Sequence, residues 1–133
     1  EVLPHWTEGR DALVLAEVDD PRNWPASDDA GDPLARLRFY DRHGARLLPL
    51  RYFQPSLRKG SPRVDGMFLL RLDRSPEHSG ELLAAFLEKY FTACEGTGSV
   101  VDPPVSSLLA TARGLDLERD TWAVDRWPEV PPA

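Results

Sequence analysis

The sequence predicts an α+β fold, with a mixed or antiparallel sheet of about three to four strands and two to three helices. Three observations support this prediction. The 133 residues are enough for one domain with a core of its own. The composition, 41% apolar and 29% charged, is that of an ordinary folded protein. Short apolar runs typical of strands alternate with segments in which apolar residues recur at helical spacing.

The first predicted strand is the apolar run at residues 12–18, Ala-Leu-Val-Leu-Ala-Glu-Val. It is short and rich in branched residues, which is typical of a buried strand. The preceding residues 1–7 have the composition of a frayed helix end, which Pro4 opposes. Residues 19–31 are rich in Asp and contain Pro, Asn, Ser and Gly, so we expect them to form a loop.

The next predicted element is an amphipathic helix of about three turns. Asp32-Pro33 supplies an N-cap followed by proline at the first helical position. Leu34, Leu37 and Phe39-Tyr40 then alternate with charged residues, which gives the helix one apolar side. Gly44 is expected to end this helix in a left-handed conformation.

Two strands are predicted after this helix. The first covers residues 46–54, and Pro49 within it indicates a sheet edge, a bulge or a place where its missing N–H is not needed. The second covers residues 67–72 and runs antiparallel to the first across a loop at 55–65. A basic group of side chains surrounds this loop. It could meet an anionic group such as a cofactor phosphate or an acidic partner, and a solvated loop is the simpler explanation. The group consists of Arg51, Arg58, Lys59 and Arg63.

The last third of the chain is predicted to be helical and then irregular. Ser75-Pro76-Glu77 has the order of cap, proline and acid that opens helices, and apolar residues then recur every three or four positions. This predicts a helix at 77–94 that ends at Gly96, and a shorter helix is expected at 104–113. Residues 122–132 contain two Trp and three Pro with little regular pattern, so we expect an extended arm or a partly loose segment.

Charge and composition exclude several functional classes. The net charge of −6 opposes broad nucleic-acid binding, which needs a basic face. No apolar run approaches the ~20 residues that span a bilayer, and the N-terminus lacks the pattern of a secretory signal. The single cysteine, Cys94, cannot form an internal disulfide, which suits the cytoplasm, although a secreted protein without disulfides would look similar. We expect a cytoplasmic protein that binds neither nucleic acid nor membrane.

One segment resembles a known enzyme family. Residues 37–46, Leu-Arg-Phe-Tyr-Asp-Arg-His-Gly-Ala-Arg, are similar to the helix motif of GNAT-type (Gcn5-related) N-acetyltransferases, in which a tyrosine precedes a glycine by four positions and the chain continues into a strand. The strand before this helix then resembles the fifth strand of that fold, and the two strands after it resemble the sixth and seventh. On this resemblance residues 11–73 form a GNAT-like core, and residues 74–133 form a helical extension with a Pro/Trp-rich tail.

The resemblance covers only the C-terminal half of the family and has two departures. The family usually begins this helix with Asn-x-x-Ala and follows it with Gly-Phe, whereas this chain has Asp32-Pro33-Leu34-Ala35 and Gly44-Ala45. The family holds the pyrophosphate of acetyl-CoA in a Gln/Arg-x-x-Gly-x-Gly/Ala loop before the fifth strand, and this chain contains no such sequence. Because residue 1 is Glu rather than Met, we expect a trimmed or C-terminal part of a longer protein, completed by the missing N-terminal half or by a second chain.

The resemblance implies an acyl-CoA-dependent N-acetyltransferase that uses acetyl-CoA and a small-molecule or peptide amine. Tyr40 matches the family's general acid, since a phenol with a pKa near ~10 suits a thiol leaving group. A role as a half-buried aromatic anchor of the helix is equally open for Tyr40. Glu17 and Asp19, at the end of the predicted fifth strand, are candidates for a general base or an amine-binding carboxylate, and solvent contacts or turn formation are their simpler roles.

Two other functions stay open. The first is a non-catalytic interaction or regulatory module that dimerises or pairs with a partner through an exposed sheet edge. The second is an unrelated small enzyme that uses Glu17, Asp19, Tyr40 or His43. The three histidines follow no metal-ligand spacing, and His43 falls in the last helical turn, where a capping role is expected. The Gly-rich stretch 96–99 lacks the lysine of a phosphate loop and follows a helix, so we interpret it as a turn.

Overall fold

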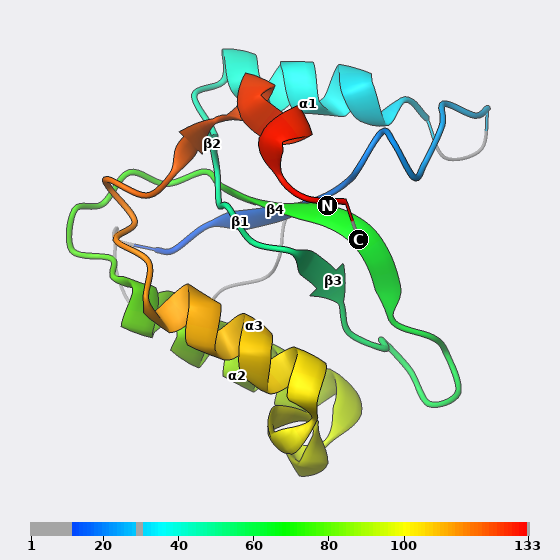
Figure 1. Ribbon diagram of the computed structural model, residues 1–133, viewed down its shortest axis with the longest axis vertical. Helices are drawn as coiled ribbons and strands as arrows, with labels where there is room; N and C mark the ends of the chain where they lie inside the picture. The colour runs from blue at the N-terminus through cyan, green and yellow to red at the C-terminus, as the bar shows by residue number, and fades with distance from the viewer. Residues whose placement is uncertain (1–11, 29–30, 133) are drawn as a thin grey trace.

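The computed structural model describes residues 12–28 and 31–132 of the chain. An antiparallel sheet separates helix α1 on one face from helices α2 and α3 on the other (Figure 1). The predicted α+β class is therefore confirmed. The described residues form five strands, one more than the largest number expected, together with three α-helices. The helix end suggested at residues 1–7 lies outside the described residues.

The longest strand, β4, is the centre of the sheet. β1 pairs antiparallel along one side of it, while β2 and β3 pair along the other, and β5 lies outside β2. A strand with neighbours on both sides and helices over both faces buries consecutive apolar side chains, which explains the run Phe68-Leu69-Leu70. The strands are β1 Leu15–Asp19, β2 Arg46–Leu47, β3 Tyr52–Gln54, β4 Val64–Arg71 and β5 Trp122–Ala123.

The predicted strand at 46–54 is divided at its proline. The N–H of Leu48 still donates to the carbonyl of Leu69 in β4 at 3.0 Å. Pro49 has no N–H to donate, and the N–H of Leu50 turns back onto the carbonyl of Leu48 at 2.8 Å. Pairing with β4 resumes only in β3. The predicted single strand is therefore two strands, and Pro49 lies between them, where its missing N–H is not needed.

Helix α1, Pro33–Arg42, begins and ends as predicted. The Asp32 carboxylate accepts a hydrogen bond from the second helical N–H at 3.0 Å, which is the N-cap interaction. At the other end His43 is the C-cap residue, and its Nδ1 lies 2.8 Å from the carbonyl oxygen of Phe39. Gly44 follows with φ of 80°, a conformation that favours glycine.

Helix α2, Gly80–Glu95, starts three residues later than predicted. Its N-cap is Ser79, whose Oγ accepts a hydrogen bond from the N–H of Leu82 at 3.2 Å. Ser75 is not the cap because its backbone is held by Asp73 and Arg71, and the first turn of the predicted helix is used for those contacts instead. A serine does cap this helix, but it is Ser79 rather than the predicted Ser75.

Replacing Ser79 with alanine is expected to lower the free energy of unfolding by about 1 kcal/mol, the usual cost of losing an N-cap. The matched Ser75→Ala variant should lose much less, because the Ser75 Oγ accepts only a 3.4 Å hydrogen bond from Glu77. Urea denaturation followed by tryptophan fluorescence measures both. A larger loss of unfolding free energy in Ser75→Ala than in Ser79→Ala would indicate that Ser75 is the N-cap, as predicted from the sequence.

Helix α3, Pro103–Arg113, packs against α2 after a short 3-10 helix at Thr97–Val101. The predicted end of α2 is confirmed at Gly96, which has φ of 92°. The start of α2 comes so close to the end of α3 that a Cβ on Gly80 would lie 2.4 Å from the carbonyl oxygen of Leu115. Only glycine fits at this contact. Within the described residues, no helix combines the length and the apolar character needed to cross a membrane.

The sheet buries a separate apolar core on each face. The α1-side core is the smaller of the two, and the α2-side core lies under α2 and α3 (Figure 1). The α1-side core consists of Ala16, Val18, Leu37, Ala45, Leu47, Phe68, Leu70, Val124 and Val130. The buried members of the α2-side core include Leu13, Leu15, Leu48, Leu50, Tyr52, Phe53, Leu69, Leu83, Leu87, Phe91, Val105, Leu108, Leu109 and Leu117.

The C-terminal tail is more regular than expected from its sequence. It supplies β5 and a 3-10 helix at Val124–Glu129, and it buries Val124 and Val130 in the α1-side core. Arg22 fastens it from a distant loop: one guanidinium nitrogen donates to the carbonyl of Val130 at 2.9 Å and pairs with Asp20 at 2.7 Å. The same guanidinium lies 5.5 Å from the ring centre of Trp127. The prediction of an extended arm with little regular structure is therefore wrong.

Candidate functional site

Glu17 is a buried carboxylate in the middle of β1, with 3% of its surface exposed. It accepts a hydrogen bond from the Tyr52 hydroxyl at 2.6 Å and another from the Gln54 amide nitrogen at 3.0 Å. The Tyr90 hydroxyl, from α2, donates to it at 3.4 Å. Two strands and one helix therefore fix the orientation of a single carboxylate.

The phenol of Tyr52 is held in its neutral, hydrogen-bond-donating form. Burial raises the pKa of Tyr52 well above its usual value. The negative charge of Glu17 and the hydrogen bond to it raise this pKa further. Tyr52 therefore donates to Glu17 throughout the physiological pH range.

The Glu17 carboxylate lines a hollow of about 350 Å³, called here the Glu17 hollow. Asp19 lines it too, and lies two residues further along the same side of β1. Arg36 reaches the hollow from α1, with its Nη1 3.7 Å from the Asp19 Oδ2. Two carboxylates and one guanidinium give the lining a formal charge of −1, which favours a small cation. The complete lining is Glu17, Asp19, Arg36, Gln54 and Met67.

Tyr40 is not part of the lining of the Glu17 hollow. The Glu17 side chain meets Tyr52 and Tyr90 on the α2 face of the sheet, whereas Tyr40 lies on the α1 face. Its half-buried ring packs against the α1-side core and meets the ring of Phe39 edge-on at 5.5 Å. It lies one helical turn after Arg36, and residues four apart are neighbours on the surface of a helix. Among the described residues, none hydrogen-bonds to the Tyr40 hydroxyl. The structure thus brings Glu17 and Asp19 together and leaves Tyr40 on the other face of the sheet from the Glu17 carboxylate.

Three of the four basic side chains noted in the sequence, Arg58, Lys59 and Arg63, line one hollow of about 400 Å³. Arg63 is engaged in ion pairs with Glu95 and Asp102, each at 2.6 Å. Arg51 lies along a different groove, while Arg58 and Lys59 are exposed at the tip of the loop between β3 and β4. Arg63 is neutralised by its two carboxylates, so Arg58 and Lys59 are the cations of this hollow that remain for solvent or for an anion.

Acid is expected to weaken the protein through Glu95. Hydrogen bonds from Arg63 are the largest cause that lowers the pKa of Glu95 from 4.5 to about 2. A lowered pKa means that the stabilisation is complete above pH 4.5 and is lost as the pH falls toward 2. A pKa difference of one corresponds to about 1.4 kcal/mol, so the expected loss in free energy of unfolding is about 3 kcal/mol.

Urea denaturation at a series of pH values measures this loss. In Arg63→Met the pKa of Glu95 should return toward its usual value, so the part of the acid dependence between pH 4 and 2 should shrink. A pH profile that is unchanged in Arg63→Met would contradict the assignment to this pair.

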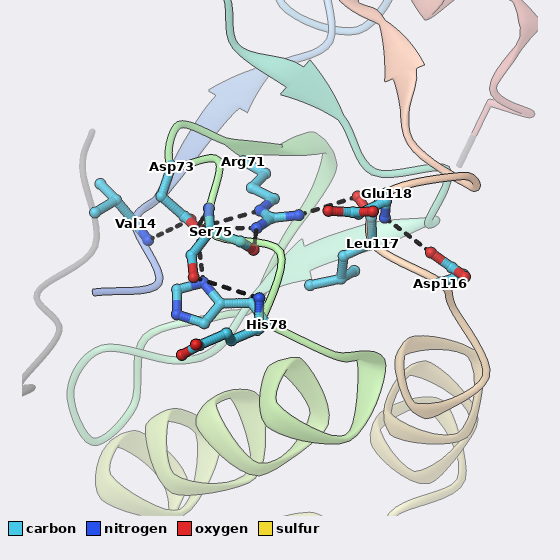
Figure 2. A network of polar contacts seen from close by, with 9 residues as sticks. Val14, Arg71, Asp73, Ser75, His78, Asp116, Leu117 and Glu118 are labelled. Atoms are coloured by element: carbon cyan, nitrogen blue, oxygen red, sulfur yellow. Dashed lines mark hydrogen bonds and ion pairs between the residues drawn. The ribbon is translucent and has the colours of Figure 1, made fainter. Parts of the chain in front are cut away.

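A second buried polar network ties β4 to the start of α2 (Figure 2). Arg71, 4% exposed, donates to the Asp73 Oδ2 at 3.0 Å and to the carbonyl of Leu117. The Oδ2 of Asp73 also lies 2.6 Å from Nδ1 of His78, and its Oδ1 accepts from the N–H of Val14 at 2.9 Å. Burial alone would raise the pKa of Asp73, but these hydrogen bonds and the charge of Arg71 hold it below its usual value. We interpret the network as structural because it joins three separate segments of the chain, at Val14, at residues 71–78 and at Leu117.

Sequence reasoning missed the donors Tyr52, Gln54 and Tyr90. Two signals were present: Glu17 is the one charged residue in an apolar run, and Tyr52 and Gln54 alternate along one side of a predicted strand. The sequence pattern does not reveal that β4 lies between the strands of Glu17 and Tyr52. That sheet order sets these side chains on the same face within reach of each other.

Among the described residues, no group of three His, Cys, Asp or Glu side chains is placed to hold a metal ion. No family model matches the chain, and no curated protein or solved structure is detectably similar to it. The function therefore has to be inferred from the geometry of the site.

Proposed function

We propose that this chain is the C-terminal part of an acyl-CoA-dependent N-acetyltransferase and that the Glu17 hollow receives the acceptor amine. The observation that carries this proposal is the Glu17 carboxylate itself. Acidic side chains are rarely buried to this degree, and this one is oriented by three donors yet still lines a hollow. A titratable group fixed at the wall of a concave site is a candidate for acid–base chemistry.

The chemistry of the lining suits a primary amine. An amine reaches the site as an ammonium ion, which the carboxylates of Glu17 and Asp19 attract. The nitrogen must lose a proton before it can attack a thioester carbonyl, and Glu17 is placed to accept that proton. Met67 offers an apolar wall for the carbon chain next to the nitrogen.

Tyr40 is assigned the second proton transfer on the basis of the family resemblance. When the carbon–nitrogen bond forms and the carbon–sulfur bond breaks, the departing thiolate needs a proton. Tyr40 lies one helical turn from Arg36, which lines the Glu17 hollow, but it packs on the opposite face of the sheet from the Glu17 carboxylate, so this role rests on the resemblance alone. The Tyr40 phenol would supply this proton from the α1 side of the sheet.

The Gln/Arg-x-x-Gly-x-Gly/Ala loop that holds the pyrophosphate of acetyl-CoA in the family is absent from this sequence. Gly96 ends α2, and residues 97–99 belong to a short 3-10 helix, which offers no long helix N-terminus for a phosphate. Binding of acetyl-CoA therefore depends on residues supplied by an upstream segment or by a second chain. We assign no part of cofactor binding to the described residues.

Isothermal titration calorimetry of the complete gene product tests the proposal. Acetyl-CoA is expected to release or absorb heat in a saturable manner, whereas ATP, a control with similar phosphates, should not. Release of free thiol from acetyl-CoA is then measured with a panel of primary amines. A folded protein that gives no heat with acetyl-CoA would show that the proposal is wrong. Heat of binding without amine-dependent thiol release would show that the protein binds acetyl-CoA but is not an N-acetyltransferase for these amines.

A further inference from the structure

The outer edge of β3 is open over the residues that follow the break at Pro49. β5 covers this side of the sheet only at β2, where Leu47 lies opposite Trp122. After Ala123 the chain turns into the 3-10 helix and leaves the sheet. Figure 1 shows β3 between α3 on one side and the C-terminal end on the other.

The pairing pattern identifies which backbone groups face outward. Hydrogen bonds from Asp20 to Gly66 and from Leu72 to Val14 direct the even-numbered residues of β4 toward β1, so its odd-numbered residues face β2 and β3. Tyr52 lies opposite Met67 and therefore turns its N–H and C=O inward to β4.

The residues on either side of Tyr52, Arg51 and Phe53, turn their N–H and C=O outward. No described residue outside the β3–β4 pairing hydrogen-bonds to these groups. Free backbone groups at a sheet edge are a template for another strand.

This edge opens into a groove of about 450 Å³, called here the β3 groove. Ser107, Leu108 and Thr111 of α3 form one wall, and Val130 and Pro131 of the tail form the opposite wall. The volume lies within the range of ligand-binding sites, about 300 to 1,000 Å³. The floor is the broken strand from Pro49 to Phe53 together with residues 65–68 of β4 and Asp20, which follows β1.

We propose that the β3 groove binds an extended peptide segment of a partner protein, which adds as a strand to the outer edge of β3. Main-chain hydrogen bonds to Arg51 and Phe53 would provide affinity, and alternate side chains of the peptide would contact the two walls. Arg51 is exposed at the mouth of the groove with no described ion-pair partner. Two carboxylates line the same groove, Asp20, which is paired with Arg22, and the exposed Asp65, so an acidic residue of the peptide is favoured next to Arg51 and disfavoured next to Asp65.

A second copy of this chain fits the groove less well than a peptide. The β3 edge is recessed between α3 and the tail, and in a second copy the same edge is recessed in the same way. Two recessed edges cannot approach to the about 4.8 Å that separates paired strands. A single extended segment has no such walls of its own and enters the groove freely. This inference is independent of the acetyltransferase proposal, since it uses none of the residues of the Glu17 hollow except Met67, which lines both cavities.

A phage-displayed library of random dodecapeptides selected on the purified chain tests the inference. We expect enriched peptides with apolar residues at alternate positions and an acidic residue, and fluorescence anisotropy of a labelled synthetic peptide gives its Kd. Ser107→Trp fills the groove from an exposed position of α3 and should raise the Kd at least tenfold. Ser106→Trp, exposed on the same helix but outside the groove, is the matched control and should change the Kd less than twofold.

Amide hydrogen exchange of Phe53 provides a second readout and should slow when the peptide binds. The inference is wrong if no peptide is enriched, if both tryptophan variants weaken binding equally, or if Phe53 exchange is unchanged. Analytical ultracentrifugation tests whether a second copy of the chain occupies the groove. A dimer that Ser107→Trp dissociates and Ser106→Trp does not would assign the groove to a second copy and overturn the inference.

Discussion

Replacing Asp73 with alanine is expected to lower the free energy of unfolding by about 3 to 5 kcal/mol, the cost of removing one partner of a buried ion pair. The guanidinium of Arg71 is 4% exposed and would be left buried without its counter-charge. His78 and the N–H of Val14 would lose their acceptor at the same time. A loss of this size is a large part of the stability of an ordinary domain.

Urea denaturation at neutral pH measures the effect, with Asp41→Ala as the control, because Asp41 is an exposed side chain of α1. The control should change the free energy of unfolding by less than about 0.5 kcal/mol. The double variant Arg71→Met, Asp73→Leu should recover much of the loss, since it removes both charges together. A loss below about 1 kcal/mol in Asp73→Ala would mean that water already reaches Arg71.

The sign of the pH dependence follows from the direction in which the pKa moves. The pKa of Asp73 is lowered in the folded protein, so its stabilisation is present above the usual aspartate value and is lost as the pH falls below it. Acid therefore weakens the Asp73 network and the Arg63–Glu95 pair in the same direction. Asp73→Asn should show a smaller dependence on pH than the unaltered protein.

Replacing Glu17 with glutamine is expected to lower kcat/KM for the proposed acetyl transfer by about 10²- to 10⁴-fold, the range for loss of a general base. The amide keeps the size of the side chain but accepts no proton from the amine. Its NH₂ group would also face either the Gln54 amide or the tyrosine hydroxyls, all of which donate to the carboxylate in the unaltered protein. Some loss of stability is expected beside the loss of activity.

Activity and stability are separated by measuring both in three variants. Tyr52→Phe removes the hydroxyl that orients Glu17 while leaving its carboxylate, so it should reduce activity less than Glu17→Gln. Glu118→Gln, an exposed acid far along the chain, should change kcat/KM less than twofold. Full activity in folded Glu17→Gln would show that Glu17 is a structural residue and not the general base. Asp19, the other carboxylate of the hollow, would then be the candidate for that role.

The sequence was sufficient to predict those features of the fold that depend on neighbouring residues. Asp32-Pro33 and Gly44 set the limits of α1, and Pro49 interrupts its strand because it has no N–H. These features follow from residues that are adjacent in the chain. They would be the same in almost any surrounding fold.

The remaining features depend on contacts between distant residues. Ser75 resembles an N-cap as closely as Ser79 does, and only the Asp73 network decides between them. β5 is two residues long and has no periodicity to recognise. The surroundings of Glu17 arise because β4, late in the sequence, lies between two earlier strands. Side-chain alternation indicates a face of a strand but not its neighbour.

The tail held by Arg22 affects the order in which the fold can be completed during synthesis. β5, Val124 and Val130 leave the ribosome after every other described strand and helix, yet they close the α1-side core. Until then Leu37 and Phe68 lack part of their cover, while the α2-side core can already be assembled. Proteolytic cleavage just before Trp122 would recreate this stage in the finished protein. The uncovered apolar face would then be a binding surface for quality-control factors that recognise exposed apolar side chains.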